Sequence, residues 1–133
     1  MENKSLDPAG HLSLNVSNFE TSKKFYQEIF RLLSYKKIRD TESSAGWVTK
    51  EGFGIWLRRA KSPDLQHEHL TPAIHHLCMK AKTKEVVDQV YRQVVAKQVF
   101  IFAKPKSYPE FTANYYAVSF TDLDGIKIEV AYY

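Results

Sequence analysis

Three side chains spread along the sequence, His11, His76 and Glu129, are of the types that together bind a divalent first-row metal ion. Two imidazoles and one carboxylate on one side of an ion leave other coordination positions open. An ion with open positions can polarise a substrate oxygen or stabilise an enediolate or alkoxide. The spacing of the three residues matches no local motif, so a shared site depends on the elements that carry them.

A duplication in the sequence relates the two histidines. His11 and His76 each begin a short segment of alternating apolar residues, and each segment is followed by an apolar helical stripe, one containing Phe25 and the other Val90. The same spacing of 65 residues separates the histidines (76 − 11) and the stripes (90 − 25). A shared offset across a strand and a helix indicates an internal repeat.

Each copy reads as one strand, one helix and three further strands. In the first copy we expect strands at 11–17, 35–41, 45–49 and 53–59, and a helix from an Asn18 or Thr21 cap to about Leu33. In the second copy we expect strands at 74–81, 99–103, 115–121 and 125–132, and a helix at 84–97, with an Asp124-Gly125 hairpin turn.

The sequence therefore predicts an α+β fold in one domain, residues 1–133. Two tandem βαβββ modules, about 11–60 and about 74–132, are joined by a linker at 61–73. We expect them to form a half-open, cup-shaped mixed sheet with the helices on the outside.

Strand alternation predicts which side chains face the cup. Because Leu12, Leu14 and Val16 form the apolar set under the first helix, the residues between them face the cup. The same rule applies to the second copy and to the last strand. The cup-facing residues are then His11, Ser13, Asn15, His76, Cys78, Lys80, Lys127, Glu129 and Ala131.

Simpler alternatives stay open for these residues. The two histidines are ordinary polar side chains if the protein has lost its metal, and Glu129 can form an ion pair with Lys127 or Arg58. His75 replaces its neighbour as the ligand if the strand register is off by one residue. The histidines of segment 67–69 lie in the proline-flanked linker, where exposure to solvent is favoured over metal binding.

Composition narrows the class of protein. With 133 residues and 44% hydrophobic residues, the chain can build one domain core. Cys78 is the single cysteine, so an intramolecular disulfide is excluded. The sequence has no apolar segment of the membrane or signal-peptide type. We therefore expect a cytoplasmic protein that does not bind membranes. The net charge of +4 is spread along the chain, which favours a small anionic ligand over nucleic acid.

Four segments together resemble one known superfamily. They are His11-Leu-Ser-Leu-Asn-Val, Ser22-Lys-Lys-Phe25-Tyr26, Ile74-His-His76-Leu and Tyr115-Tyr116-Ala-Val-Ser-Phe-Thr-Asp122-Leu-Asp124-Gly125-Ile-Lys-Ile-Glu129. The chain resembles the vicinal oxygen chelate superfamily, which includes glyoxalases, extradiol dioxygenases, fosfomycin-resistance enzymes, methylmalonyl-CoA epimerases and bleomycin-binding proteins. The resemblance covers residues 11–132 and implies paired modules around a metal ion, with ligands at His11, His76 and Glu129.

Departures from the superfamily pattern bear on the branch. Aligning 54–59 with 125–130 places Arg58 where glyoxalases and epimerases carry a fourth acidic group, so a conventional glyoxalase and an epimerase are both disfavoured. A three-ligand set resembles the dioxygenase and fosfomycin-modifying branches. Ser13 is similar to the small hydroxyl residue of fosfomycin enzymes, but the sequence ends at Tyr133 without their downstream arginine, and no potassium-binding loop is visible.

We therefore expect a metal-dependent enzyme, dioxygenase-, lyase- or transferase-like, that chelates a small, oxygen-rich and anionic substrate on Fe, Mn, Zn or Ni. The alternative is a metal-free small-molecule binding protein of the bleomycin-resistance type. A homodimer is expected in either case. Candidate catalytic residues are Ser13, Tyr115 and Tyr116, and candidate substrate-binding residues are Asn15, Arg58 and Cys78. For the tyrosines the alternative is an aromatic core, and for Arg58 an exposed strand end.

Overall fold

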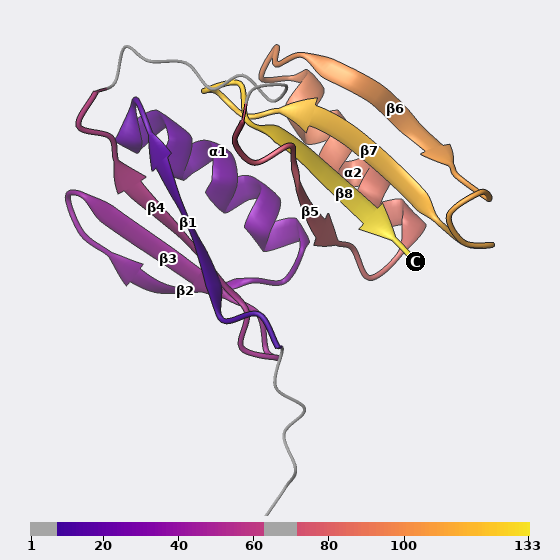
Figure 1. The fold of residues 1–133 in the computed structure, drawn as a ribbon, viewed down its shortest axis with the longest axis horizontal. Helices are drawn as coiled ribbons and strands as arrows, with labels where there is room; N and C mark the ends of the chain where they lie inside the picture. The colour runs from indigo at the N-terminus through magenta and orange to yellow at the C-terminus, as the bar shows by residue number, and fades with distance from the viewer. Residues whose placement is uncertain (1–7, 63–71) are drawn as a thin grey trace, which may run out of the picture. The chain divides into compact units, whose positions relative to one another are not determined.

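The structure is a computed structural model that describes residues 8–62 and 72–133 (Figure 1). The chain divides into two compact units, Met1–Leu65 and Gln66–Tyr133, and the boundary falls inside the predicted linker. The histidines of segment 67–69 lie outside the described residues. Each unit is therefore described by itself.

The first unit is a four-stranded mixed sheet with one helix. Its elements are β1 (His11–Val16), α1 (Phe19–Leu32), β2 (Lys36–Asp40), β3 (Ser44–Val48) and β4 (Gly54–Arg59). The strand order is β1-β4-β3-β2, in which β1 runs parallel to β4 and the other neighbours are antiparallel. The helix α1 packs on one face of this sheet (Figure 1).

The second unit repeats this order. Its elements are β5 (Leu77–Lys80), α2 (Lys84–Val95), β6 (Ile101–Ser107), β7 (Tyr116–Thr121) and β8 (Lys127–Tyr132). The strand order β5-β8-β7-β6 again places a parallel pair beside two antiparallel ones. The α+β fold built from two tandem βαβββ modules is therefore confirmed, whereas the cup and the single domain remain predictions.

The helix starts preserve the predicted repeat. The Asn18 side chain accepts a hydrogen bond from the Thr21 amide at 3.2 Å, and the Thr83 hydroxyl accepts one from the Val86 amide at 3.2 Å. The two caps are separated by the same 65 residues (83 − 18). Side-chain capping of the first turn satisfies amides that have no partner within the helix. Of the two predicted caps, Asn18 is the one used.

Burial follows the predicted strand alternation in the first strand of each unit, whereas Ala131 of the last strand, predicted to face the cup, is fully buried. Leu14, Val16, Met79 and Ala81 are at most 5% exposed and lie under the helices, whereas His11 is exposed. The core of the first unit is aromatic and is tied to α1 by a 2.8 Å hydrogen bond from the Trp47 indole to the Gln27 side chain. Its largest fully buried side chains are Phe19, Tyr26, Ile29, Phe30, Trp47, Ile55 and Leu57.

One strand extends further than its sequence pattern indicates. The sequence pattern predicts a strand at 99–103, but β6 continues to Ser107 and includes Pro105. Because β6 is an edge strand, a residue without an amide hydrogen is tolerated there.

The predicted hairpin turn connects the end of β7 to β8. In this turn the Asp122 carboxylate accepts hydrogen bonds from the amides of Asp124 and Ile126. No helix in the described ranges is both long and apolar enough to cross a membrane.

Candidate functional site

The start of β5 and the middle of β8 bring two predicted metal ligands together. His76 lies just before β5, and its Nε2 atom is 3.2 Å from Oε2 of Glu129 on β8. Parallel pairing of β5 with β8 places Cys78 directly opposite Glu129. His76 precedes Cys78 by two residues, so it also lies close to Glu129. The side chains are 35% and 17% exposed, respectively, so both can be reached from solvent.

The two candidate tyrosines lie on opposite faces of the second sheet. The Tyr115 hydroxyl donates a 2.5 Å hydrogen bond to Oε1 of Glu129, on the face away from α2. The Tyr116 hydroxyl donates a 2.6 Å hydrogen bond to Asp88 on α2. Tyr115 therefore belongs to the cluster around Glu129, whereas Tyr116 packs beneath the helix.

Burial and the carboxylate of Glu129 keep nearby groups protonated. Burial, followed by the hydrogen bond to Glu129, raises the pKa of Tyr115 far above its usual value. Burial and repulsion from Glu129 also raise the pKa of the Cys78 thiol to about 11. At neutral pH Tyr115 is therefore a hydrogen-bond donor, and Cys78 is a neutral thiol rather than a nucleophile.

We predict slow alkylation of Cys78 for this reason. Since the thiolate is the reactive form, a pKa of about 11 leaves a small reactive fraction at pH 8. Labelling by iodoacetamide at pH 8 should be at least about tenfold slower than that of glutathione and should accelerate as pH rises toward the pKa. Urea-unfolded protein provides the control. A native rate equal to that of glutathione would contradict the structure.

A second contact involves the neighbouring histidine. The Nδ1 atoms of His75 and His76 are 2.8 Å apart, so one ring must donate to the other. The contact leaves Nε2 of His76 directed at Glu129. It thereby positions the ring that is the predicted ligand.

The spacing in this cluster fits two ligands of one metal ion. Metal–ligand bonds of about 2.1 Å place two ligand atoms about 3.0 Å apart at a right angle and about 3.4 Å apart at the tetrahedral angle. The 3.2 Å between His76 Nε2 and Glu129 Oε2 lies between these values, although it equally fits a hydrogen bond in the metal-free protein. No group of three or more metal-ligating side chains occurs within 8–62 and 72–133.

The third predicted ligand, His11, lies on β1 of the first unit. It is exposed on the sheet face opposite α1, together with Ser13 and Asn15. Cross-strand pairing continues this face onto β4, where Trp56 lies opposite Ser13 and Arg58 lies opposite Asn15. The predicted orientation of the first-unit candidates thus agrees with the observed strand register.

The strand register corrects one alignment made from the sequence. Glu129 lies opposite Cys78, and the residue 65 positions before Cys78 is Ser13, which lies opposite Trp56. The first-unit counterpart of Glu129 is therefore Trp56 rather than Arg58. The position still lacks a carboxylate, so the basis for disfavouring a conventional glyoxalase is retained.

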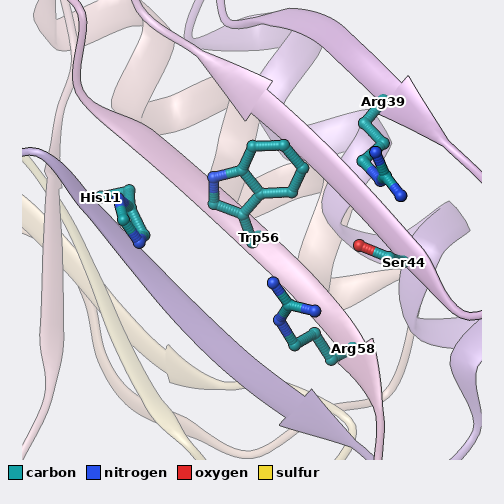
Figure 2. A pocket seen from close by; sticks show the side chains of 5 residues that line it. All are labelled: His11, Arg39, Ser44, Trp56 and Arg58. Carbon is teal, nitrogen blue, oxygen red and sulfur yellow. The ribbon is translucent and has the colours of Figure 1, made fainter.

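A pocket of about 420 Å³ occupies this face of the first sheet (Figure 2). All four strands contribute to it. Its lining residues are His11, Arg39, Ser44, Trp56 and Arg58. Figure 2 shows Trp56 between His11 on one side and Arg39 and Ser44 on the other. Of these residues, only His11 and Arg58 are predicted site residues from the sequence.

A β-bulge explains why Arg39 was missed. The β2–β3 register shifts between Lys37 and Arg39, which places Arg39 opposite Gly46 on the pocket face. Its neighbour Asp40 lies opposite Ala45 and pairs with Lys23 of α1 at 3.1 Å, on the other face. Bulges redirect side chains in this way and leave no clear signal in a single sequence. Trp56 was detectable, because it shares its strand parity with Arg58.

Comparisons with known proteins agree with this architecture. Protein YqjT of Bacillus subtilis (strain 168), an uncharacterized protein, is 30% identical over 122 residues, which are 90% of this chain and 94% of that protein. A glyoxalase/bleomycin resistance protein from Albidiferax ferrireducens T118 superposes with a TM-score of 0.79 at 18% identity, covering 96% of this chain and 100% of that one.

A glyoxylase/bleomycin resistance protein/dioxygenase domain from Frankia sp. EAN1pec superposes with a TM-score of 0.73 at 20% identity, covering 96% and 98% of the two chains. At these identities the structural likeness shows the fold alone. A family model, however, matches residues 9–130, which is most of the sequence. The chain therefore belongs to the Glyoxalase/Bleomycin resistance protein/Dioxygenase superfamily.

Proposed function

We propose that this protein is a metal-dependent, glyoxalase-related enzyme that chelates a small, oxygen-rich anionic substrate. His11, His76 and Glu129 would hold the divalent ion, and the reaction would be dioxygenase-, lyase- or transferase-like. The observation that carries the proposal is the 3.2 Å approach of His76 to Glu129, both of which can be reached from solvent. Two imidazoles and a carboxylate suit Fe, Mn, Zn or Ni and leave open positions for substrate.

The chain's own residues have distinct parts in this proposal. A bound metal ion would supply a Lewis acid for the substrate oxygens. Tyr115 holds Oε1 of Glu129, which leaves Oε2 facing His76, and its raised pKa keeps the proton on the hydroxyl. Tyr115 is thus a positioning residue for the ligand and a hydrogen-bond donor, not a base.

The other predicted site residues would contact substrate. Arg58 and Asn15 lie opposite each other across β1 and β4, and Ser13 lies on the same face. An arginine beside an amide and a hydroxyl can bind an anionic group through several hydrogen bonds. Cys78 is a half-buried neutral neighbour of Glu129 and would line the other part of the substrate site.

Metal titration of the untagged protein tests the proposal. After treatment with a chelator, the protein is titrated anaerobically with Fe²⁺, Mn²⁺, Zn²⁺ and Ni²⁺, and bound metal is counted by elemental analysis after gel filtration. We expect one tightly bound equivalent per chain for at least one ion. Failure of all four ions to bind would overturn the enzyme assignment.

Tyr115→Phe is expected to weaken metal binding without unfolding the protein. The substitution removes the hydrogen bond that orients Glu129, and loss of such an outer partner commonly lowers metal affinity about 10- to 100-fold. Tyr116→Phe is the matched control, because it removes a similar hydrogen bond from the adjacent residue, on the helix side of the sheet. Competition against a chromophoric chelator measures both affinities. Equal losses would show that Tyr115 acts only through stability.

A metal-free binding protein is the second candidate. It is favoured by the pocket of the first unit, whose lining includes two arginines and an indole and which does not depend on a metal. In this case the protein would bind a small molecule without converting it. A homodimer is proposed for either function and can be measured by sedimentation.

A further inference from the structure

Two arginines on the pocket face of the first sheet lack a carboxylate partner among the described residues. Arg39 and Arg58 both line the pocket and are exposed. The neighbouring Arg59 differs, because it donates a 2.9 Å hydrogen bond to the Glu42 carbonyl and its guanidinium lies 5.3 Å from the centre of the Phe19 ring. The acidic residue closest in sequence to Arg39, Asp40, is occupied by Lys23 and Lys37 on the other face.

The indole of Trp56 lies on the sheet between these arginines and His11 (Figure 2). A Cβ atom added to Gly46 would lie 2.5 Å from Cε3 and Cζ3 of Trp56, so the six-membered ring of Trp56 covers Gly46. A Cβ atom added to Gly54 would lie 3.4 Å from Nε1 of Trp56 and 3.4 Å from Cβ of His11. The indole therefore extends along the sheet from Gly46 toward His11 and lines the pocket.

Cross-strand pairing explains how these groups come together. Arg39, Gly46 and Trp56 lie in one row across β2, β3 and β4, and Ser44 lies opposite Arg58 in the adjacent row. Figure 2 shows Ser44 between the two arginine side chains. The pocket thus combines two guanidinium groups and a hydroxyl at one end with an aromatic surface beside them. None of the five side chains that line it is acidic.

We propose that this pocket binds a planar, conjugated or aromatic anion. A carboxylate, phosphonate or phosphate group is held by Arg39, Arg58 and the Ser44 hydroxyl, and the planar part of the ligand stacks on Trp56. Guanidinium groups bind such oxyanions through paired charged hydrogen bonds, and aromatic faces pack on the indole. A ligand on Trp56 then points its other end toward His11 (Figure 2).

Identifying this ligand with the substrate rests on the proposed function, because His11 is both a wall of the pocket and a proposed metal ligand. The anion site itself requires no metal. It can therefore be tested on chelator-treated protein, with binding heat and tryptophan fluorescence as readouts. The probes are phenylphosphonate, methylphosphonate and benzyl alcohol, which separate the anionic from the aromatic contribution.

Phenylphosphonate is expected to bind and to change the fluorescence of the protein. Methylphosphonate should bind about tenfold more weakly, since ring stacking is lost, and benzyl alcohol should not bind measurably. Arg39→Gln and Arg58→Gln should each weaken phenylphosphonate binding about 10- to 100-fold, because each removes charged hydrogen bonds. Gly46→Ala should weaken phenylphosphonate but not methylphosphonate, because the added methyl group displaces the Trp56 ring.

Arg59→Gln is the matched control. It removes the same charge from the adjacent position of β4, outside the pocket lining, and should change the affinity less than about threefold. Circular dichroism confirms that each variant is folded. Equal losses for Arg58→Gln and Arg59→Gln would show a net-charge effect and overturn the site, as would a failure of phenylphosphonate to bind wild-type protein.

The two proposals fail separately in these experiments. Metal binding without phenylphosphonate binding contradicts the anion pocket and leaves the proposed enzyme in place. Phenylphosphonate binding that depends on Arg39 and Arg58 in a protein that cannot be loaded with metal supports the pocket and contradicts the enzyme.

Discussion

Replacing Glu129 with glutamine is expected to lower the affinity for Zn²⁺ or Mn²⁺ by at least about a hundredfold, because losing a ligand should exceed the effect of losing an outer partner. The amide preserves the shape of the side chain and can still accept the hydrogen bond from Tyr115, which in the wild type is 2.5 Å long. What disappears is the negative charge 3.2 Å from His76. Competition against a chelator of known affinity measures the change.

Glu110→Gln is the control for this prediction. It makes the same chemical change at an exposed residue outside the helices and strands, so metal affinity should remain within about twofold of wild type, as screening predicts for exposed charges. If Glu129→Gln binds metal as tightly as Glu110→Gln does, Glu129 is not a ligand. Its contact with His76 would then be structural.

The second large effect concerns the aromatic core of the first unit. Phe30→Ala is expected to lower the free energy of unfolding by about 3–5 kcal/mol, as for other fully buried aromatic residues. Phe30 is fully buried, and its ring centre lies 5.0 Å from that of Tyr35 and 4.9 Å from that of Trp47. Removing it opens a cavity between α1 and the sheet that carries His11.

Phe100→Ala tests whether burial is the cause. Phe100 is 63% exposed, so the same substitution should cost less than about 1 kcal/mol. Unfolding in urea is followed by circular dichroism for both variants, because tryptophan fluorescence would report on the first unit alone. Trp47 and Trp56, the two tryptophans of the chain, both belong to that unit, whereas Phe100 belongs to the second. Similar losses for the two variants would argue against the described core.

Periodicity was sufficient to predict the order of the elements. The apolar alternation of β1 and β5 and the stripes of α1 and α2 are direct consequences of burying one face, so they are visible in the sequence. Even the orientation of His11, Ser13 and Asn15 followed from Leu14 and Val16, which are at most 5% exposed. These predictions needed only local information.

Features that depend on pairing between strands were not predictable in this way. Unbroken alternation from Lys37 would place Arg39 on the face toward α1, but the bulge between them turns Arg39 to the pocket face. Likewise, the alignment made from the sequence pairs Gly54 with Gly125, but β4 begins at Gly54 whereas β8 begins only at Lys127. The counterpart of Glu129 is therefore Trp56 and not Arg58. Both errors arise because a shift of register leaves composition unchanged.

The choice between the two tyrosines also required the strand partners. Tyr115 and Tyr116 are adjacent in sequence, and only the pairing of β7 with β8 shows which one faces Glu129. Once the pairing is known, alternation assigns Tyr116 to the helix side, where it meets Asp88. The sequence supplied the candidates, and the hydrogen bonds separated them.

We propose that His11, His76 and Glu129 bind one metal ion. X-ray absorption spectroscopy of zinc-loaded wild type and the His11→Ala variant tests it most directly, because imidazole ligands give a countable scattering signature. We expect two imidazoles on zinc in the wild type and one in the variant. A zinc environment that is the same in both proteins would contradict it.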